Sequence, residues 1–347
     1  MLFNQNKENN IFFEELHLRH LSLLIDLKNK EINNWFYKMA IINTFDDLRI
    51  FLRNLDKNKN KCIIAIQNKR IIGYLYTYPL NYKKTCVKIN APKFILEECK
   101  PSKRYLIYEL IKKSISSTDL KNSNWIINSS ISDYDLISAS RELGFQPLQE
   151  IKIWSNNNFK DNDSTHIEDD DLINNFVEIN KNNIKRSLNF IRSNESILFR
   201  NLLDLDQSDI YKRNDKNSGL ILFENEIIFM ILKDLNYQDS NVYSLIRDFC
   251  WDERLNIILK YIIKAILKKN PYALFKTYSD DNDLNEYLLN LNMKEQNNEL
   301  LLVRNSLIRR DVKSENMLNK SIEKIFHKIN PQNNPFPTPY PINLRSK

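Results

Sequence analysis

A basic tract, Lys100-Pro101-Ser102-Lys103-Arg104, stands directly before a segment whose apolar spacing predicts an amphipathic helix. The first turn of a helix presents unpaired N–H groups and a partial positive charge, so anions bind there readily. Ser102 is of a residue type that caps helices, and Lys103 and Arg104 add positive charge. The tract therefore predicts an anion site, although a solvated basic helix start explains the same residues equally well.

Other arrangements that support chemistry are missing from the sequence. The cysteines do not form a C-x-x-C pair and the histidines do not cluster beside them, which argues against structural zinc, any other metal site and a disulfide framework. The residues concerned are Cys62, Cys86, Cys99 and Cys250, and His17, His20, His166 and His327. With 3 glycines in the chain, a P-loop or a dinucleotide fingerprint is excluded.

The predicted helix belongs to a pair of repeated segments. Cys99 to Ile115 aligns without a gap on Cys250 to Ile266, at an offset of 250 − 99 = 151 residues. Asp135 to Phe145 aligns on Asp283 to Met293 at 283 − 135 = 148. A shared order of elements at so long a spacing indicates one domain built twice.

The repeat predicts an α/β (α+β) fold of two tandem domains, each a mixed sheet flanked by helices. The expected boundaries are 13–154 for the first domain, 155–171 for a polar linker, 172–308 for the second domain, and 309–347 for a C-terminal helix with a Pro-rich tail. Hairpins are expected within 62–78 and 219–232, and helices within 172–205. In the repeat, Gly144 aligns with Asn292, and both residue types tolerate the left-handed backbone that ends a helix.

Charge and hydropathy narrow the class of protein. The formal net charge is +7, with 51 basic and 44 acidic residues scattered along the chain, so nucleic-acid binding is disfavoured but stays open. No apolar run approaches the roughly 18 residues of a membrane span, and the first ten residues lack a signal-peptide pattern. We expect a cytoplasmic protein that does not enter a membrane.

Three motifs carry a resemblance to a known family. They are Ile71-Ile72-Gly73-Tyr74-Leu75 in the first hairpin, Leu106-Ile107 and Leu110-Ile111 on the long helix, and Arg141-Glu142-Leu143-Gly144-Phe145. With the order of elements, these motifs resemble the GNAT superfamily of acyl-CoA-dependent N-acyltransferases. The resemblance covers 18–154 well and 172–307 weakly.

The resemblance implies where acetyl-CoA, or another acyl-CoA, would bind. In the family a glycine-rich loop before the long helix holds the pyrophosphate, and here Pro101 and Lys103 occupy the two glycine positions. The implied cofactor-binding residues are Ser102, Lys103 and Arg104. The second domain has Asp252 and Glu253 at this point, and two acids would repel a pyrophosphate.

The resemblance also implies catalytic positions. Family members often protonate the departing thiolate with a Tyr four residues before the Gly of Gly-Phe, where this chain has Ser140. Tyr134, near the start of the same helix, is an alternative acid. Glu97 and Glu98 are the nearest carboxylates for a general base, and the other interpretation is that both are surface charges.

We therefore expect an acyl-CoA-dependent N-acyltransferase that acts through the first domain on an amine acceptor the sequence does not identify. The second domain would then be a scaffold or an acceptor-binding surface. The alternative is a non-catalytic GNAT-like pair that acts as a protein or RNA interaction module, which the missing glycine loop and the missing Tyr favour.

Overall fold

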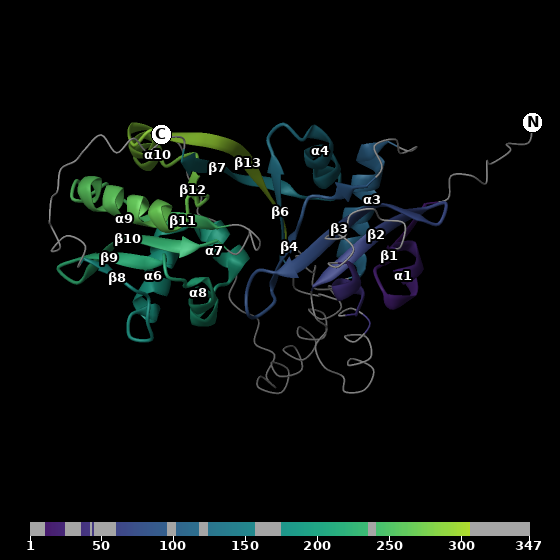
Figure 1. Ribbon diagram of the computed structural model, residues 1–347, viewed down its shortest axis with the longest axis horizontal. Helices are drawn as coiled ribbons and strands as arrows, with labels where there is room; N and C mark the ends of the chain where they lie inside the picture. Colours follow the sequence, from purple (N-terminus) through teal and green to yellow (C-terminus); the bar gives the residue numbers. More distant parts are fainter. Residues whose placement is uncertain are drawn as a thin grey trace, which may run out of the picture. The chain divides into compact units, whose positions relative to one another are not determined.

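The computed structural model describes residues 11–24, 36–41, 44, 60–95, 102–117, 124–156, 175–234 and 241–305, all within the compact unit Met1–Ser306. The predicted C-terminal helix and tail lie outside these ranges, and the predicted polar linker lies largely outside them. Figure 1 shows a large mixed sheet with helices packed against it.

The first half of the chain begins with a short edge strand and ends with a long strand. Its elements are β1 (Phe12–Glu15), a 3-10 turn (Leu18–His20), α1 (Leu21–Leu24), β2 (Lys61–Gln67), β3 (Arg70–Pro79), β4 (Cys86–Ile89), β5 (Lys93–Phe94), α3 (Lys103–Ser117), β6 (Asn124–Ser130), α4 (Tyr134–Glu142) and β7 (Gln146–Asn156). Asn68 and Lys69 have φ values of 50° and 59°, which fits the tight turn predicted between β2 and β3.

The second half repeats this order with more helices at its start. Its elements are β8 (Phe176–Val177), α6 (Ile184–Asn194), α7 (Ile197–Leu203), α8 (Gln207–Arg213), β9 (Gly219–Phe223), β10 (Glu226–Lys233), β11 (Val242–Arg247), α9 (Leu255–Lys269), β12 (Leu274–Tyr278), α10 (Asn282–Asn290) and β13 (Met293–Asn305). The helices expected within 172–205 are present, but β8 precedes them because Phe176 and Val177 pair with β9.

The ends of α4 and α10 confirm the interpretation of Gly144 and Asn292. Gly144 has φ +85° and Asn292 has φ 60°, and each lies just after its helix. Each helix also begins alike, since Asp133 caps α4 and Asp281 caps α10 through their carboxylates. The two helices thus have the same length, with an Asp cap at each start and a residue of left-handed backbone after each end.

The two halves exchange their last strands. The strand order is β1-β2-β3-β4-β6-β13-β7-β12-β11-β10-β9-β8, so β13 lies between β6 and β7, and β7 lies between β13 and β12 (Figure 1). β13 is antiparallel to both β6 and β7, and β7 is antiparallel to β12. Each half therefore completes the sheet of the other, and neither strand leaves an open edge at the centre.

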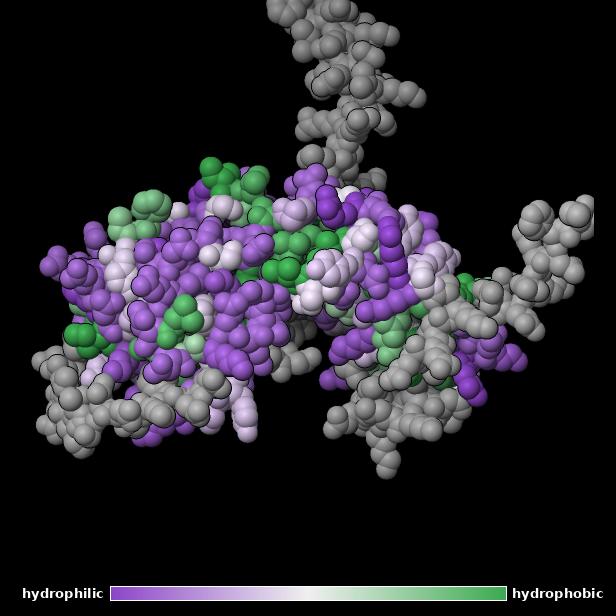
Figure 2. Space-filling view, turned by 90° about the horizontal axis from the view of Figure 1, so that it is seen from above, coloured by the Kyte–Doolittle hydropathy of each residue, from purple (hydrophilic) through white to green (hydrophobic). Residues whose placement is uncertain are grey.

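Helices cover both faces of the sheet. α3 and α4 pack on the first half with buried residues such as Leu106 and Leu136, and α9 and α10 pack on the second half with residues such as Ile258 and Leu284. The opposite face is covered by α6, α7 and α8, and by the helical residues 36–40. The surface seen in Figure 2 is mostly hydrophilic with a limited hydrophobic area, so most apolar side chains lie between these layers.

Candidate functional site

The sheet opens between two parallel strands of the first half. β4 and β6 pair from Cys86 opposite Asn124 to Ile89 opposite Ile127. The chain after Ile89 then leaves β6 and follows β3, because Asn90 donates its N–H to the carbonyl of Tyr76 at 2.9 Å and β5 pairs with β3. We call the place where β4 and β6 diverge the first wedge.

Gly73 makes this divergence possible. It lies on β3 opposite Phe94 of β5. A Cβ at this position would lie 2.9 Å from the Phe94 ring and 3.2 Å from the Lys93 carbonyl oxygen, so any larger residue would push β5 away from β3. The glycine noted in the sequence motif therefore holds the first wedge open.

The predicted anion-binding residues lie at the start of α3. The Tyr105 N–H lies 3.4 Å from the Ser102 hydroxyl oxygen, which accepts its hydrogen bond in the manner of an N-cap. Lys103 and Arg104 are exposed, and the Arg104 guanidinium pairs with Glu142 of α4, which offsets part of its charge. The structure thus places all three residues together at a helix N-terminus, and their role in binding a cofactor stays a prediction.

The two residues of α4 that were predicted as alternative acids lie in different environments. Tyr134 is 78% exposed at the first turn, whereas Ser140 is fully buried. Six residues of helix separate them by about 9 Å along its axis. The Ser140 hydroxyl has no hydrogen-bond partner among the described residues, and an unsatisfied buried hydroxyl costs about 1–3 kcal/mol. Glu97 and Glu98, the predicted bases, lie outside the described residues.

A carboxylate that the sequence analysis did not find lies beside the first wedge. Glu299 of β13 accepts a hydrogen bond from the Asn128 side-chain amide at 2.9 Å, and Asn128 follows the last β6 residue that pairs with β4. Glu299 reaches this position through the exchange of β13 into the first half. Its local sequence carries no signal for such a role, because the pairing of β13 with β6 joins residues far apart in the chain.

Lys88 lies on the same face as Glu299. Lys88 belongs to β4 and is 4% exposed. Burial lowers the pKa of Lys88 to about 8, although the negative charges of Asp234 and Glu299 oppose this change. A buried lysine whose pKa is strongly shifted next to a specific charge is a recognised indicator of a functional site.

The second half has a matching divergence, which we call the second wedge. β11 and β12 pair in parallel from Val242 opposite Leu274 to Ser244 opposite Lys276, after which β11 stays with β10 and β12 stays with β7. Here Arg247, the last residue of β11, reaches to the residues that follow β12. Its guanidinium donates to Asp281 at 2.8 Å and to Asp283 at 3.0 Å.

The start of α9 also differs from that of α3. Asp252 and Arg254 form an ion pair with a shortest contact of 2.6 Å, and the hydrogen bonds from Arg254 lower the pKa of the Asp252 carboxyl. Glu253 is exposed beside them. The two acids read from the sequence are therefore present at this helix start, and the nearest guanidinium is occupied by one of them.

The described residues offer neither a metal cluster nor a membrane helix. No group of three or more His, Cys, Asp or Glu side chains in those ranges is placed to hold a metal ion, and Cys62, Cys86 and Cys250 are not joined in disulfides there. None of the described helices is both long and apolar enough to cross a membrane.

Comparison with known proteins finds similarity among solved structures. No family model and no curated protein matches the sequence. A tandem GNAT protein from the clavulanic acid biosynthesis pathway is similar with a TM-score of 0.47 and 8% identity, covering 86% of this chain and 99% of that one. A GNAT-family acetyltransferase from Colwellia psychrerythraea has a TM-score of 0.43 and 10% identity, covering 85% and 99%.

An N-myristoyltransferase from Saccharomyces cerevisiae, solved with myristoyl-CoA and inhibitors, is also similar. Its TM-score is 0.44 at 10% identity, covering 86% of this chain and 82% of that one. Structures of GNAT acetyltransferases, one of them a tandem protein, are thus among those similar to this chain.

Proposed function

We propose that the chain is an acyl-CoA-dependent N-acyltransferase that holds its acyl-CoA at the first wedge. The observation that carries this proposal is the divergence of β4 from β6 beside Glu299 and Lys88. Where two strands part, their backbone N–H and C=O groups can pair with an inserted extended chain. The pantetheine arm of CoA is such a chain, because it is linear and carries amide groups.

The start of α3 supports the same orientation. Ser102, Lys103 and Arg104 surround a helix N-terminus, whose partial positive charge suits the pyrophosphate of CoA. Arg104 is shared with Glu142, so we expect Lys103 and the helix N–H groups to supply most of the attraction. The second half lacks such a basic helix start, because Asp252 and Glu253 at the start of α9 would repel an anion.

The two polar side chains beside the wedge suit the chemistry of acyl transfer. The amine nitrogen of the acceptor attacks the thioester carbonyl, a C–N bond forms, the C–S bond breaks, and the CoA thiolate leaves. The amine must lose one proton, which the Glu299 carboxylate can accept, and the thiolate must gain one. Lys88, with a pKa lowered to about 8 by burial, matches a thiol and can donate that proton.

The alternative function, a non-catalytic pair that binds protein or RNA, keeps some support. Ser140 occupies the position that the family resemblance assigns to an acid, and it is buried. Both glycines of the family's CoA loop are replaced. With either function we propose a cytoplasmic location, the duplication of one ancestral domain and the domain boundaries predicted from the sequence.

Calorimetric titration of the full chain with acetyl-CoA tests the proposal. We expect one binding event, weakened about tenfold or more by Lys103→Glu with Arg104→Glu, since two attractive charges become repulsive. Lys268→Glu with Lys269→Glu is the matched control, because this exposed pair lies at the far end of α9. Absence of heat at millimolar acetyl-CoA, together with a specific protein or RNA recovered by pull-down, would establish the alternative.

A further inference from the structure

A cleft lined by residues of the second half has no part in the function proposed above. It lies along α6 and α7 and has a volume of about 400 Å³, within the range of about 300–1,000 Å³ typical of small-molecule pockets. Its apolar lining consists of Ile191, Phe199, Leu203 and Leu205. Its charged lining includes Arg192, Arg200 and Glu195.

Glu195 connects this cleft to the interior of the second half. The same side chain lines a small internal cavity of about 30 Å³ that also contains Arg213, Asp234, Ser244, Lys276 and Tyr278. The Tyr278 hydroxyl donates to the Glu195 carboxylate, with oxygen separations of 2.9 and 3.0 Å. Glu195 is therefore held in a fixed orientation between buried polar groups and the open cleft.

Burial raises the pKa of Glu195 to about 6, although Lys276, Tyr278 and Arg213 favour its charged form. Lys276 is already committed to a second carboxylate, because its Nζ donates to Asp234 at 2.6 Å and both side chains are almost fully buried. A half-buried carboxylate that faces a cleft under these conditions gains stability from a cationic or hydrogen-bond-donating ligand.

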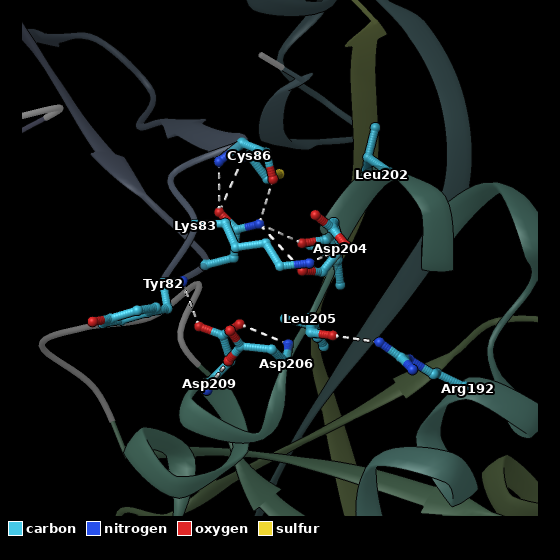
Figure 3. A network of polar contacts seen from close by, with 12 residues as sticks. Tyr82, Lys83, Cys86, Arg192, Leu202, Asp204, Leu205, Asp206 and Asp209 are labelled. Atoms are coloured by element: carbon cyan, nitrogen blue, oxygen red, sulfur yellow. Dashed lines mark hydrogen bonds and ion pairs between the residues drawn. The ribbon is translucent and has the colours of Figure 1, made fainter. Parts of the chain in front are cut away.

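The guanidinium groups of the cleft carry positive charge at its other side. Arg192 donates to the carbonyl of Leu205 at 2.9 Å, as Figure 3 shows, and so is fixed against the wall. Arg200 is half-buried and makes no ion pair with a described residue. Asp204, the other acid of the lining, is paired with Lys83 at 2.8 Å (Figure 3). The positive charges of Arg192 and Arg200 are therefore not neutralised by a described carboxylate, and a negatively charged ligand group can pair with them.

We propose that this cleft binds a small amino carboxylate, with the ligand's carboxylate at Arg192 and Arg200 and its ammonium group at Glu195. The apolar walls favour an aliphatic side chain between the two charged ends. None of the residues that line the cleft is assigned a role in acyl-CoA binding, although Asp234 and Lys276, which neighbour Glu195 in the small cavity, also act on the charge of Lys88.

Three small probes of matched shape test the proposal on the full chain by calorimetry. L-leucine carries both charges, isopentylamine lacks the carboxylate and isocaproate lacks the ammonium group. We expect L-leucine to bind at millimolar concentration or below, and each of the other two to bind at least tenfold more weakly. Equal affinity for L-leucine and either truncated probe, or no binding of L-leucine, would overturn the proposal.

Two substitutions assign the charged ends of the ligand. Glu195→Gln keeps an acceptor for Tyr278 and removes the charge, and Arg200→Gln removes one guanidinium. We expect each to weaken L-leucine binding at least tenfold, with unchanged circular dichroism. The controls, Glu286→Gln and Arg70→Gln, change exposed residues of the same types outside the cleft. Unchanged affinity in Glu195→Gln would show that the ammonium group does not meet this carboxylate.

The pH dependence gives a readout that needs no variant. Glu195 is faced by Tyr278 and Lys276 from β12, by Arg213 from α8 and by Asp234 after β10, while Arg192 and Arg200 border the cleft. Because Glu195 loses its charge below about pH 6, L-leucine should bind about tenfold more weakly at pH 5 than at pH 8. The Glu195→Gln chain should show no such change, and an equal change in it would contradict the assignment.

Discussion

The first and second wedges are built from corresponding strands in the same order, yet among the described residues only the second has an arginine whose ion pairs join its two sides. Arg247 lies 247 − 242 = 5 residues after the first paired residue of β11, and the corresponding position after β4 is 86 + 5 = 91, which is Ala91. The Ala91 side chain is uncharged and too short to reach across the first wedge. Asp133 and Asp135 nevertheless occupy the places of Asp281 and Asp283.

The comparison extends to the strands beneath the two wedges. Lys88 lies two residues into β4, and the same position of β11 is Ser244. Ser244 donates to the Asp234 carboxylate at 2.8 Å, and Asp234 also accepts from Lys276. The first wedge thus has a lysine that burial disfavours, where the second has a neutral hydroxyl. Such a cost is typical of residues retained for activity rather than for stability.

Lys88→Met removes the lysine that distinguishes the first wedge from the second. We expect it to have the largest effect on the free energy of unfolding. Between pH 8 and about 10.5 the unfolded chain keeps the lysine proton that the folded chain releases, so the free energy of unfolding of the natural chain rises with pH there. Below pH 8 the full penalty applies. The variant should therefore be more stable at pH 7, by up to about 3 kcal/mol, with the gain vanishing toward pH 10.5.

Urea unfolding at a series of pH values measures this gain. Lys216→Met is the control, because Lys216 is exposed. A variant that is less stable than the natural chain at pH 7 would show that Lys88 is stabilised by its acidic neighbours rather than penalised by burial.

Arg247→Ala should break the second wedge's ion pairs. Arg247 and Asp281 are 14% and 18% exposed, so the lost hydrogen bonds to a charged group should lower the free energy of unfolding by about 2 kcal/mol. Acetyl-CoA stoichiometry should not change, because Asp252 and Glu253 still repel an anion at α9. Thermal unfolding beside the exposed control Arg70→Ala measures the loss, and a second bound acetyl-CoA would mean that Arg247 alone closes this wedge.

The sequence was sufficient to predict the features that depend on neighbouring residues. Both hairpins, the long helices and the left-handed helix ends at Gly144 and Asn292 follow from local turn chemistry and apolar spacing. Ser102 as a cap is equally local. The two repeated segments of the sequence predicted the shared order of elements, because each segment also consists of neighbouring residues.

The features that the sequence did not reveal depend on pairing between distant residues. The exchange of β7 and β13 cannot be read from either strand, because the apolar residues of a strand indicate that it is buried but not which strand lies beside it. Glu299 gains its position beside Asn128 through that exchange, and Glu195 meets Tyr278 across 83 residues of chain. Tyr134 and Ser140 were alternative candidates on one helix; one is exposed and the other buried, and the role of either stays a prediction.

Ala91→Arg copies the tie of the second wedge into the first. An arginine at position 91 has Asp133 and Asp135 available as Arg247 has Asp281 and Asp283, and it would join the ends of β4 and β6. If acyl-CoA enters between these strands, its affinity should fall about tenfold, or about 1.4 kcal/mol, while the free energy of unfolding stays the same or rises slightly. Calorimetric titration with acetyl-CoA measures the effect.

Two companions isolate the cause of that fall. Ala91→Gln adds a long side chain without charge and should bind acetyl-CoA nearly as well as the natural chain. Adding Asp133→Ser and Asp135→Ser to Ala91→Arg should restore binding, because serine still caps α4 but cannot hold the new guanidinium in an ion pair. If Ala91→Arg binds acetyl-CoA with unchanged affinity, the ligand does not pass between β4 and β6, and the difference between the two wedges concerns stability alone.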